Sequence, residues 1–150
     1  MKIIKGNLIG LALSGNLDVI IHGCNCFNTM GGGIALQIKN TFPEAFSVDS
    51  LTQKGSRDKL GTISVATIKR NDLVFDVVNA YTQFNYGRNS MNVDYEAVRS
   101  CLKLVKQLFT GKRIGYPKIG AGLAGGDWGI LEKIFDEELE GEDHTLVVFD

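Results

Sequence analysis

The chain has 150 residues, 44% of them hydrophobic, and its 16 basic and 17 acidic residues leave a net charge of −1. A chain of this size and composition can bury one sizeable core, so we expect a single domain spanning residues 1–150. The near-zero charge argues against a nucleic-acid-binding role that depends on a basic face. No apolar run reaches the roughly 20 residues of a membrane-spanning helix, so no membrane association is expected.

The cysteines bear on compartment and metal binding. Their number, three, is odd, and Cys24 and Cys26 are too close in sequence for the usual structural disulfide. The N-terminus lacks the apolar region of a signal peptide, which favours reduced thiols and a cytoplasmic protein. A structural zinc site needs four ligands, often from CxxC pairs, and the sequence contains no such pair. The sequence therefore predicts no metal and no cofactor.

The first third of the chain begins with short strands. Residues 2–5 and 18–22 have the apolar, β-branched character of strands, and the apolar run 8–13 between them is compatible with a helical turn. Apolar residues then recur at helical spacing from residue 34, which predicts a helix over 34–40. Pro43 ends that helix or opens a second short helix over 43–53.

The middle of the chain predicts two further strands and then a loop. Residues 61–69 and 73–80 are rich in β-branched residues and are separated by a polar turn. Residues 81–92 are polar and aromatic without any period, so they predict a loop of roughly a dozen residues. A loop of that length is typical of a functional lid. Arg88 within it is a candidate phosphate clamp, or an ordinary solvated charge.

The last third contains the clearest helix, over residues 93–110. Its expected inward face consists of Val93, Ala97, Cys101, Leu104, Val105 and Leu108. A strand within 112–119 follows, then an acidic helix over 128–140 with Ile130, Ile134 and Leu139 inward, and a last strand over 144–149. Because strands and helices interleave, we expect an α/β fold with a mainly parallel or mixed sheet covered on both faces.

Two glycine-rich stretches each leave a predicted strand and enter a predicted helix, at residues 31–33 and 120–126. Backbone N–H groups and the helix dipole at such a start favour anions, and glycine lets a phosphate approach the backbone closely. Either stretch alone could be a tight turn. Because ligands of α/β sheets bind beyond the carboxyl ends of the strands, the pair predicts one phosphate-bearing ligand held from two sides.

Three polar residues near these stretches are candidates for chemistry. His22 could act as general acid or base, since imidazole titrates near neutral pH, or could be a buried histidine bonded to the backbone. Asn25 could orient a sugar hydroxyl or a water, or hold a turn. Asp127 is well placed to cap the helix that follows and could also position a water. Cys24 and Cys26 are disfavoured as nucleophiles, because only His22 adjoins them as a potential cation.

Four motifs in this order resemble the macro domain, the ADP-ribose-binding module. Gly6-Asn7-Leu8-Ile9 resembles its adenine-receiving element, and Val147-Val148-Phe149-Asp150 resembles its last strand, whose aromatic residue stacks on adenine in some members. His22-Gly23-Cys24-Asn25 with Gly31-Gly32-Gly33-Ile34-Ala35 resembles the family core, and Gly120-Ala121-Gly122-Leu123-Ala124-Gly125 resembles its second phosphate loop. The resemblance implies a three-layer α/β/α sandwich around a central mixed, largely parallel sheet.

The same resemblance implies a set of ligand-binding residues. They are Asn7, Leu8, Gly31, Gly32, Gly33, Ile34, Gly120, Ala121, Gly122, Leu123, Ala124, Gly125 and Phe149. Two of them depart from the family pattern, because Asn7 stands where many members have Asp and Ala124 stands where many have Phe. Some relatives use a lysine nucleophile, but no lysine occurs between Lys69 and Lys103, so lysine-adduct chemistry is not expected.

Within the family, the run from His22 to Asn25 resembles the ADP-ribose-1''-phosphate phosphatase branch. This likeness implies a phosphoric monoester hydrolase that acts on ADP-ribose-1''-phosphate. The residues themselves make His22, Asn25 and Asp127 the catalytic candidates, and no metal requirement is expected because no acidic cluster lies near either glycine stretch. The alternatives are an ADP-ribosyl hydrolase that removes ADP-ribose from protein or nucleic acid, and a non-catalytic ADP-ribose reader. The expected partner is therefore ADP-ribose or its 1''-phosphate, with nucleic acid only as an ADP-ribosylated substrate, and the expected state is a monomer.

Overall fold

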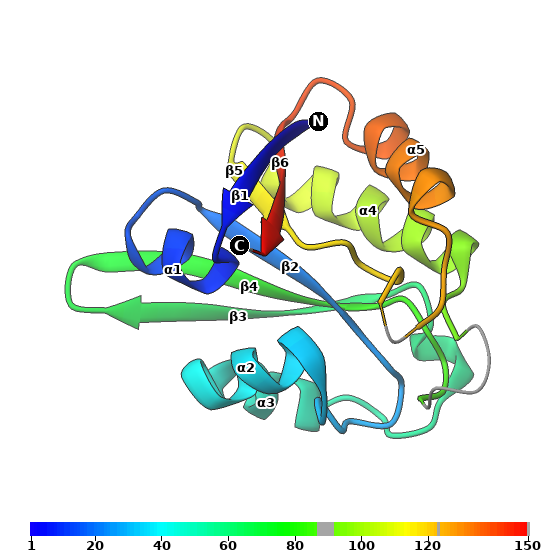
Figure 1. The fold of residues 1–150 in the computed structure, drawn as a ribbon. Helices are drawn as coiled ribbons and strands as arrows, with labels where there is room; N and C mark the ends of the chain where they lie inside the picture. The colour runs from blue at the N-terminus through cyan, green and yellow to red at the C-terminus, as the bar shows by residue number, and fades with distance from the viewer. Residues whose placement is uncertain (87–91, 123, 150) are drawn as a thin grey trace.

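The computed structural model describes residues 1–86, 92–122 and 124–149, and within them six strands form one sheet (Figure 1). The strand order is β1-β6-β5-β2-β4-β3. Neighbouring strands run parallel except β3 and β4, which are antiparallel. The bounds are Lys2–Gly6 for β1, Val19–Cys24 for β2, Ile63–Arg70 for β3, Leu73–Tyr81 for β4, Arg113–Tyr116 for β5 and Asp143–Phe149 for β6.

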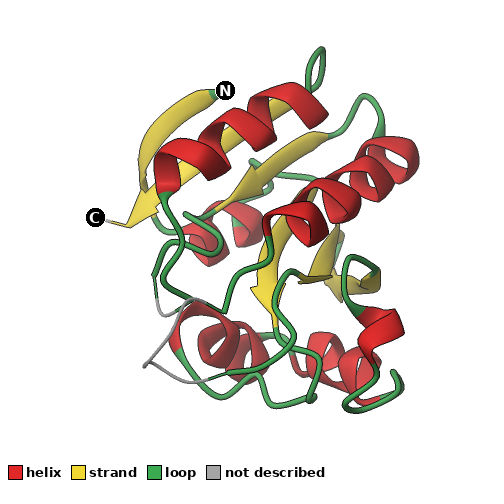
Figure 2. Cartoon of the chain, turned by 90° about the vertical axis from the view of Figure 1, so that its right-hand side faces the viewer, coloured by secondary structure: helices red, strands yellow, loops and turns green. Residues whose placement is uncertain are grey.

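Helices cover both faces of this sheet, as Figures 1 and 2 show. The helices are α1 (Leu8–Leu13), α2 (Gly33–Thr41), α3 (Pro43–Ser50), α4 (Tyr95–Phe109) and α5 (Trp128–Glu138), with a 3-10 helix η1 at Arg57–Lys59. Helices α4 and α5 share one core with the sheet, and α1, α2 and α3 share the other. The expected three-layer α/β/α arrangement with a mixed, largely parallel sheet is confirmed.

The two cores follow from the alternation of side chains along the central strands. In β2, Val19 and Ile21 pack with α4 and α5, whereas Ile20 between them packs with the helices on the opposite face. All three are fully buried or nearly so. A strand covered on both faces requires a continuous apolar run, which is why this segment is recognisable in the sequence.

The expected inward faces of two helices are wrong at one residue each. Leu108 in α4 is 62% exposed and Ile130 in α5 is 47% exposed, whereas the next residue in each helix, Phe109 or Leu131, is buried. Successive helical residues point about 100° apart, so the sheet-facing stripe passes one position later than the spacing suggested. Tyr81 is also not part of a lid, because it ends β4 and is fully buried.

The strand order brings two distant segments together. Strands β2 and β5 are parallel neighbours, so the segments that follow Cys24 and Tyr116 leave the sheet at the same edge. From β2 the chain continues toward β3 and β4 on one side of the sheet, whereas from β5 it continues toward β6 on the other side. In α/β sheets such a topological switch point leaves a crevice beyond the strand ends. In the described part of the chain no helix has the length and apolar character needed to cross a bilayer.

Candidate functional site

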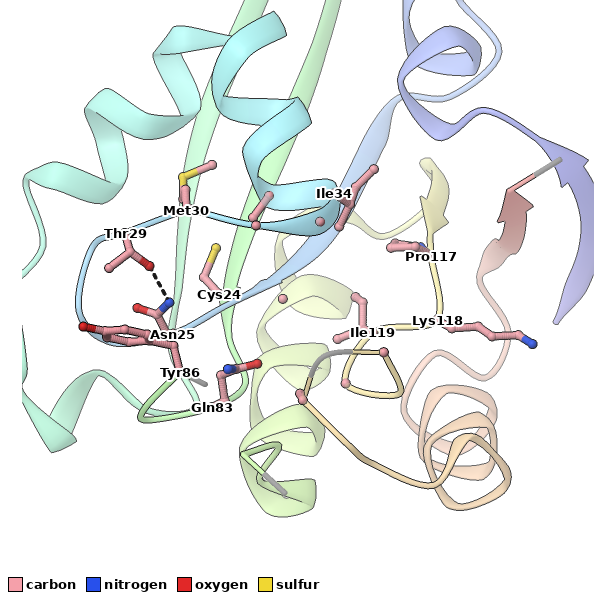
Figure 3. A pocket seen from close by; sticks show the side chains of 18 residues that line it. Cys24, Asn25, Thr29, Met30, Ile34, Gln83, Tyr86, Pro117, Lys118 and Ile119 are labelled. Atoms are coloured by element: carbon pink, nitrogen blue, oxygen red, sulfur yellow. Dashed lines mark hydrogen bonds between the residues drawn. The ribbon is translucent and has the colours of Figure 1, made fainter. Parts of the chain in front are cut away.

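A cleft of about 590 Å³ opens at the carboxyl ends of β2 and β5 (Figure 3). The first glycine loop, residues 25–33, forms one wall, and the second glycine loop, residues 117–127, forms the other. The described lining residues are Gly23, Cys24, Asn25, Thr29, Met30, Gly31, Gly32, Gly33, Ile34, Ala35, Gln83, Tyr86, Pro117, Lys118, Ile119, Gly120, Gly122 and Ala124. The structure thus brings together the two glycine loops that the sequence singled out.

Asn25 braces the first glycine loop from inside the cleft. Its Oδ1 accepts a hydrogen bond from the Phe27 N–H at 2.8 Å, and its Nδ2 donates to Thr29 Oγ1 at 2.7 Å (Figure 3). An amide carries a second N–H, so Asn25 holds the loop and still has a donor for a ligand. The two roles considered for this residue, turn and ligand contact, are therefore compatible in one geometry.

The start of α2 supplies the anion-binding character of the first glycine loop. The first backbone hydrogen bond of α2 runs from the Leu36 N–H to the Gly32 carbonyl, four residues earlier, at 3.3 Å. The amides of Gly33, Ile34 and Ala35 precede that bond and line the cleft. Unpaired amides at the positive end of a helix dipole form a ready site for phosphate.

The second glycine loop depends on close backbone packing. Its two ends are tied by the Gly126 N–H, which donates to the Gly120 carbonyl at 2.7 Å, and Gly120 has a left-handed backbone with φ of 78°. A Cβ on Gly126 would lie 2.6 Å from the same carbonyl oxygen, so no larger residue fits there. Gly122, which lines the cleft, differs, because a Cβ there would meet no atom within 4 Å.

The other loop residues expected to contact a ligand fall into three groups: one lines the cleft, two do not, and two lie outside the described residues. Ala124 is buried and lines the cleft, and its carbonyl accepts from the Asn92 and Val93 amides at 2.8 and 3.3 Å. Ala121 and Gly125 lie in the second glycine loop without lining the cleft. Leu123 and Arg88 lie outside the described residues, so their expected ligand contacts stay predictions.

The described lining contains no carboxylate and no imidazole. Its ionisable side chains are Cys24, Tyr86 and Lys118, and Lys118 extends away from the distal end where Asn25, Gln83 and Tyr86 lie (Figure 3). Burial raises the pKa of Cys24 well above its usual range, which keeps the thiol protonated and unreactive. No group of three or more His, Cys, Asp or Glu residues in the described chain could hold a metal ion.

His22 lies behind Cys24 and is fully buried rather than lining the cleft. Its Nε2 lies 2.6 Å from Asn79 Oδ1, an arrangement in which the imidazole donates and the amide oxygen accepts. The sulfur of Cys24 is 3.7 Å from the same nitrogen. Burial lowers the pKa of His22 to about 4, so the ring is neutral at pH 7. Its expected acid or base role stays a prediction, and the geometry shows a structural role in addition.

Asp127 caps α5 as expected. Its Oδ1 accepts from the Gly129 N–H at 2.8 Å, and its own N–H donates to the Tyr95 hydroxyl at 3.0 Å. The residue is exposed and is not among the residues that line the cleft. Its possible second role, positioning a water, stays a prediction.

The residues expected at the adenine form a separate corner on the same edge of the sheet. Asn7 caps α1, because its Oδ1 accepts from the Gly10 N–H at 2.9 Å, and Leu8 next to it is buried. Gly6 pairs with Phe149 across β1 and β6, and the Phe149 side chain is 75% exposed. These residues do not line the cleft, so their contact with a base stays a prediction.

Sequence reasoning missed some lining residues and one buried support. Gln83 lies inside the segment that was treated only as a lid, and it presents its side chain at the distal end of the cleft. Lys59 is only 7% exposed and bonds to the first glycine loop, although a lysine next to Arg57 and Asp58 gives no sequence signal of burial.

Comparisons with known proteins agree with this geometry. Residues 21–135 match the family model of the Macro domain. An uncharacterized 17.5 kDa protein of Enterobacteria phage T4 is 38% identical over 141 residues, which cover 91% of this chain and 88% of the phage protein. The macrodomain of Thermus aquaticus DarG superposes with a TM-score of 0.71 at 25% identity, covering 99% of this chain and 97% of that one.

A more distant relative is named for a reaction. The DNA ADP-ribosyl glycohydrolase of Mycobacterium tuberculosis is 25% identical over 125 residues. The match covers 83% of this chain but only 35% of that relative, so most of the relative's length has no counterpart here.

Proposed function

This chain belongs to the macro-domain family, and from that premise we propose that its cleft binds ADP-ribose and that the protein hydrolyses ADP-ribose-1''-phosphate. The observation that carries the proposal is the pair of glycine loops facing each other across one cleft. A volume of about 590 Å³ lies within the range usual for sites of small ligands and cofactors. Amides at the start of α2 on one side and the second glycine loop on the other suit a diphosphate.

The distal end of the cleft suits a sugar. Asn25, Gln83 and Tyr86 gather there and present neutral donors and acceptors. Neutral groups of this kind hydrogen-bond sugar hydroxyls without competing with the phosphates for charge. In the proposal Asn25 orients the distal ribose, so that the C1'' substituent lies between the two glycine loops.

The proposed reaction is transfer of a phosphoryl group to water. Water attacks phosphorus, the bond from phosphorus to the C1'' oxygen breaks, and a proton reaches that oxygen to give ADP-ribose and inorganic phosphate. Because the described lining has no carboxylate or imidazole, charge in the transition state is stabilised mainly by backbone N–H groups. The sequence also names His22 as a candidate acid or base. Because its ring is neutral at pH 7 and bonded to Asn79, the leaving oxygen takes its proton from water in this proposal, and turnover in folded His22→Ala tests whether His22 contributes.

A second candidate is release of ADP-ribose from a modified macromolecule. The observation that favours it is the similarity to a DNA ADP-ribosyl glycohydrolase over 83% of this chain. That candidate needs the same two glycine loops and a different leaving group at C1''. A reader without catalysis needs the loops alone.

One series of measurements separates the three. Calorimetric titration with ADP-ribose tests binding, and incubation with ADP-ribose-1''-phosphate, ADP-ribosylated DNA and ADP-ribosylated protein tests turnover on matched substrates. Phosphate release supports the first candidate, release of ADP-ribose from a polymer supports the second, and binding without turnover leaves a reader. Absence of ADP-ribose binding by folded protein would overturn all three. Gly122→Val, which fills the cleft without touching the core, is the control for contaminating activity.

A further inference from the structure

A buried lysine, Lys59 at the end of η1, contacts the first glycine loop from outside the cleft. Lysine is seldom buried unless its ammonium has partners. Here Nζ donates to the Cys26 carbonyl at 3.2 Å and to the Asn28 side-chain oxygen, and it lies 4.7 Å from the centre of the Tyr81 ring. Burial lowers the pKa of Lys59, and the nearby Asp49 carboxyl opposes that change. The cation is thus directed at the loop rather than at solvent.

Asn28 receives further contacts from the same side. Its Nδ2 donates to the Thr52 carbonyl at 3.1 Å, and its Oδ1 also accepts from the Thr52 hydroxyl at 3.3 Å. The Gly55 N–H donates to the Cys26 carbonyl at 2.7 Å. The segment from Thr52 to Lys59 therefore forms a clasp around two residues of the first glycine loop.

The clasped residue has an uncommon backbone conformation. Asn28 has φ of 58°, and Met30 two residues later has φ of 41°. Both values lie in the left-handed region, which is uncommon for residues other than glycine. Such conformations persist when surrounding contacts over-determine them, and they concentrate at ligand sites. The backbone that follows includes Gly31–Gly33, which line the cleft.

We propose that Lys59 is a positioning residue that presets the first glycine loop for phosphate, by holding Asn28 in its left-handed conformation. The proposal rests on the proposed ADP-ribose binding for its affinity readout only. Among the described residues the Lys59 ammonium hydrogen-bonds to the Cys26 carbonyl and to Asn28, so it acts on the loop through these two residues. A loop held in its bound shape avoids the cost of ordering on binding.

The test compares variants that change the clasp with variants that change the backbone preference. Lys59→Met removes the ammonium and keeps the stem, and Lys59→Arg keeps a cation. Asn28→Ala removes the clasp and disfavours the left-handed backbone, whereas Asn28→Gly removes the clasp and tolerates that backbone. Lys103, an exposed residue of α4, gives the control Lys103→Met. Each is titrated with ADP-ribose well below its melting temperature.

Lys59→Met should weaken ADP-ribose binding roughly tenfold, the equivalent of the strain of one left-handed residue. Lys59→Arg should recover part of that loss, and Asn28→Ala should lose more than Asn28→Gly. Adding Lys59→Met to Asn28→Gly should cost less affinity than Lys59→Met costs in the parent, because the bond between Lys59 and Asn28 is then already absent and only the bond to the Cys26 carbonyl is lost. Equal, additive losses for Lys59→Met and Asn28→Gly would overturn the proposal, as would unchanged affinity in folded Lys59→Met.

Hydrogen exchange without ligand separates this proposal from the proposed function. In Lys59→Met the amides of residues 31–35 should exchange faster, while those of residues 120–122 and 124–126 keep the parent rate, because the described residues of the second glycine loop form no backbone hydrogen bond with residues 52–59. If the parent fails to bind ADP-ribose, the proposed function fails, and this exchange comparison still decides the role of Lys59. Equal acceleration in both loops would show general destabilisation and overturn a positioning role.

Discussion

Three residues of the first glycine loop have a left-handed backbone, and two of them, Asn28 and Met30, carry side chains, the third being Gly33. In the described part of the second loop the left-handed residues, Gly120 and Gly125, are both glycines. The first loop is held by side-chain bonds from Asn25 inside the cleft and from Lys59 outside it. The second is held by backbone bonds and by packing that excludes a Cβ. The first loop is therefore stabilised largely by side-chain hydrogen bonds and the second largely by close backbone packing, so we expect different substitutions to disrupt them.

The largest expected effect is on stability, from Gly126→Ala in the second glycine loop. The new Cβ would lie 2.6 Å from both the Gly120 carbonyl oxygen and Val93 Cγ1. Overpacking against backbone should cost about 3 kcal/mol, or roughly 9 °C in melting temperature. The control is Gly122→Ala, whose Cβ meets nothing within 4 Å. Equal melting temperatures for the two variants would contradict the packing argument.

The second effect concerns His22, whose buried ring is bonded to Asn79 of β4. Its folded pKa of about 4 is below the unfolded value of 6.5, so the unfolded chain binds the proton first as the pH falls. Stability from this group is present above pH 6.5 and is lost progressively between pH 6.5 and about 4, by about 3 kcal/mol in total. Urea unfolding of parent and His22→Gln across this range measures it. Parallel pH profiles for the two proteins would contradict the burial of a neutral imidazole.

The third effect is on binding without a matching loss of stability. Gly31 and Gly122 both line the cleft, and a Cβ at either would have only ordinary contacts or none. Gly31→Val and Gly122→Val should therefore stay folded, with melting temperatures within roughly 2 °C of the parent. Each should weaken ADP-ribose binding by at least about tenfold, because a branched side chain occupies the phosphate position. Parent-like affinity in either folded variant would remove that loop from the phosphate site.

A smaller effect is expected from Asp127→Ala at the far end of the second glycine loop. Loss of the cap on α5 should cost about 1 kcal/mol of stability. Asp127→Asn can still cap the helix and should restore most of it. Neither should change ADP-ribose affinity, because the side chain is bonded to the Gly129 N–H and does not line the cleft. A clear affinity loss in Asp127→Asn would instead place the carboxylate on the ligand.

The smallest expected effect is that of a chelator. Both glycine loops offer backbone N–H groups, and no metal-ligating cluster occurs among the described residues. Titration with ADP-ribose before and after chelation should give the same affinity. A loss that magnesium restores would show that the diphosphate brings a cation into the cleft.

Sequence reasoning placed correctly those elements that are determined by residues close together in the sequence. The apolar run of β2 and the glycine stretches beside it are examples, because burial on both faces and close phosphate approach each restrict composition strongly. The α5 cap at Asp127 was also foreseeable, since capping depends on residues within one turn. Leu108 and Ile130 were misplaced because a helix with two apolar stripes shows its sheet-facing side only when it is packed.

The candidate site was foreseeable in its loops and less so in its supports. Gln83 reaches the cleft because β4 lies next to β2, a pairing that no local pattern encodes. For His22 the sequence left an acid or base role and a buried structural role open, and its burial beside Asn79 of β4 could be seen only in the fold. The buried ammonium of Lys59 is stabilised by the Cys26 carbonyl and by Asn28, which lie next to it only in the folded chain. Such tertiary supports depend on long-range contacts, which spacing along the chain cannot reveal.

The pairing of β2 with β5 has a kinetic consequence. Asp18 and Arg113, which bond beside this pair, are 95 residues apart in sequence. Bringing residues so far apart together reduces the entropy of the chain before the stabilising contacts form. We therefore expect the two walls of the cleft to meet late in folding. A ligand that spans them should then slow unfolding more than it accelerates refolding. In a stopped-flow experiment ADP-ribose should therefore lower the unfolding rate and leave the refolding rate nearly unchanged, because it binds only after the sheet has formed.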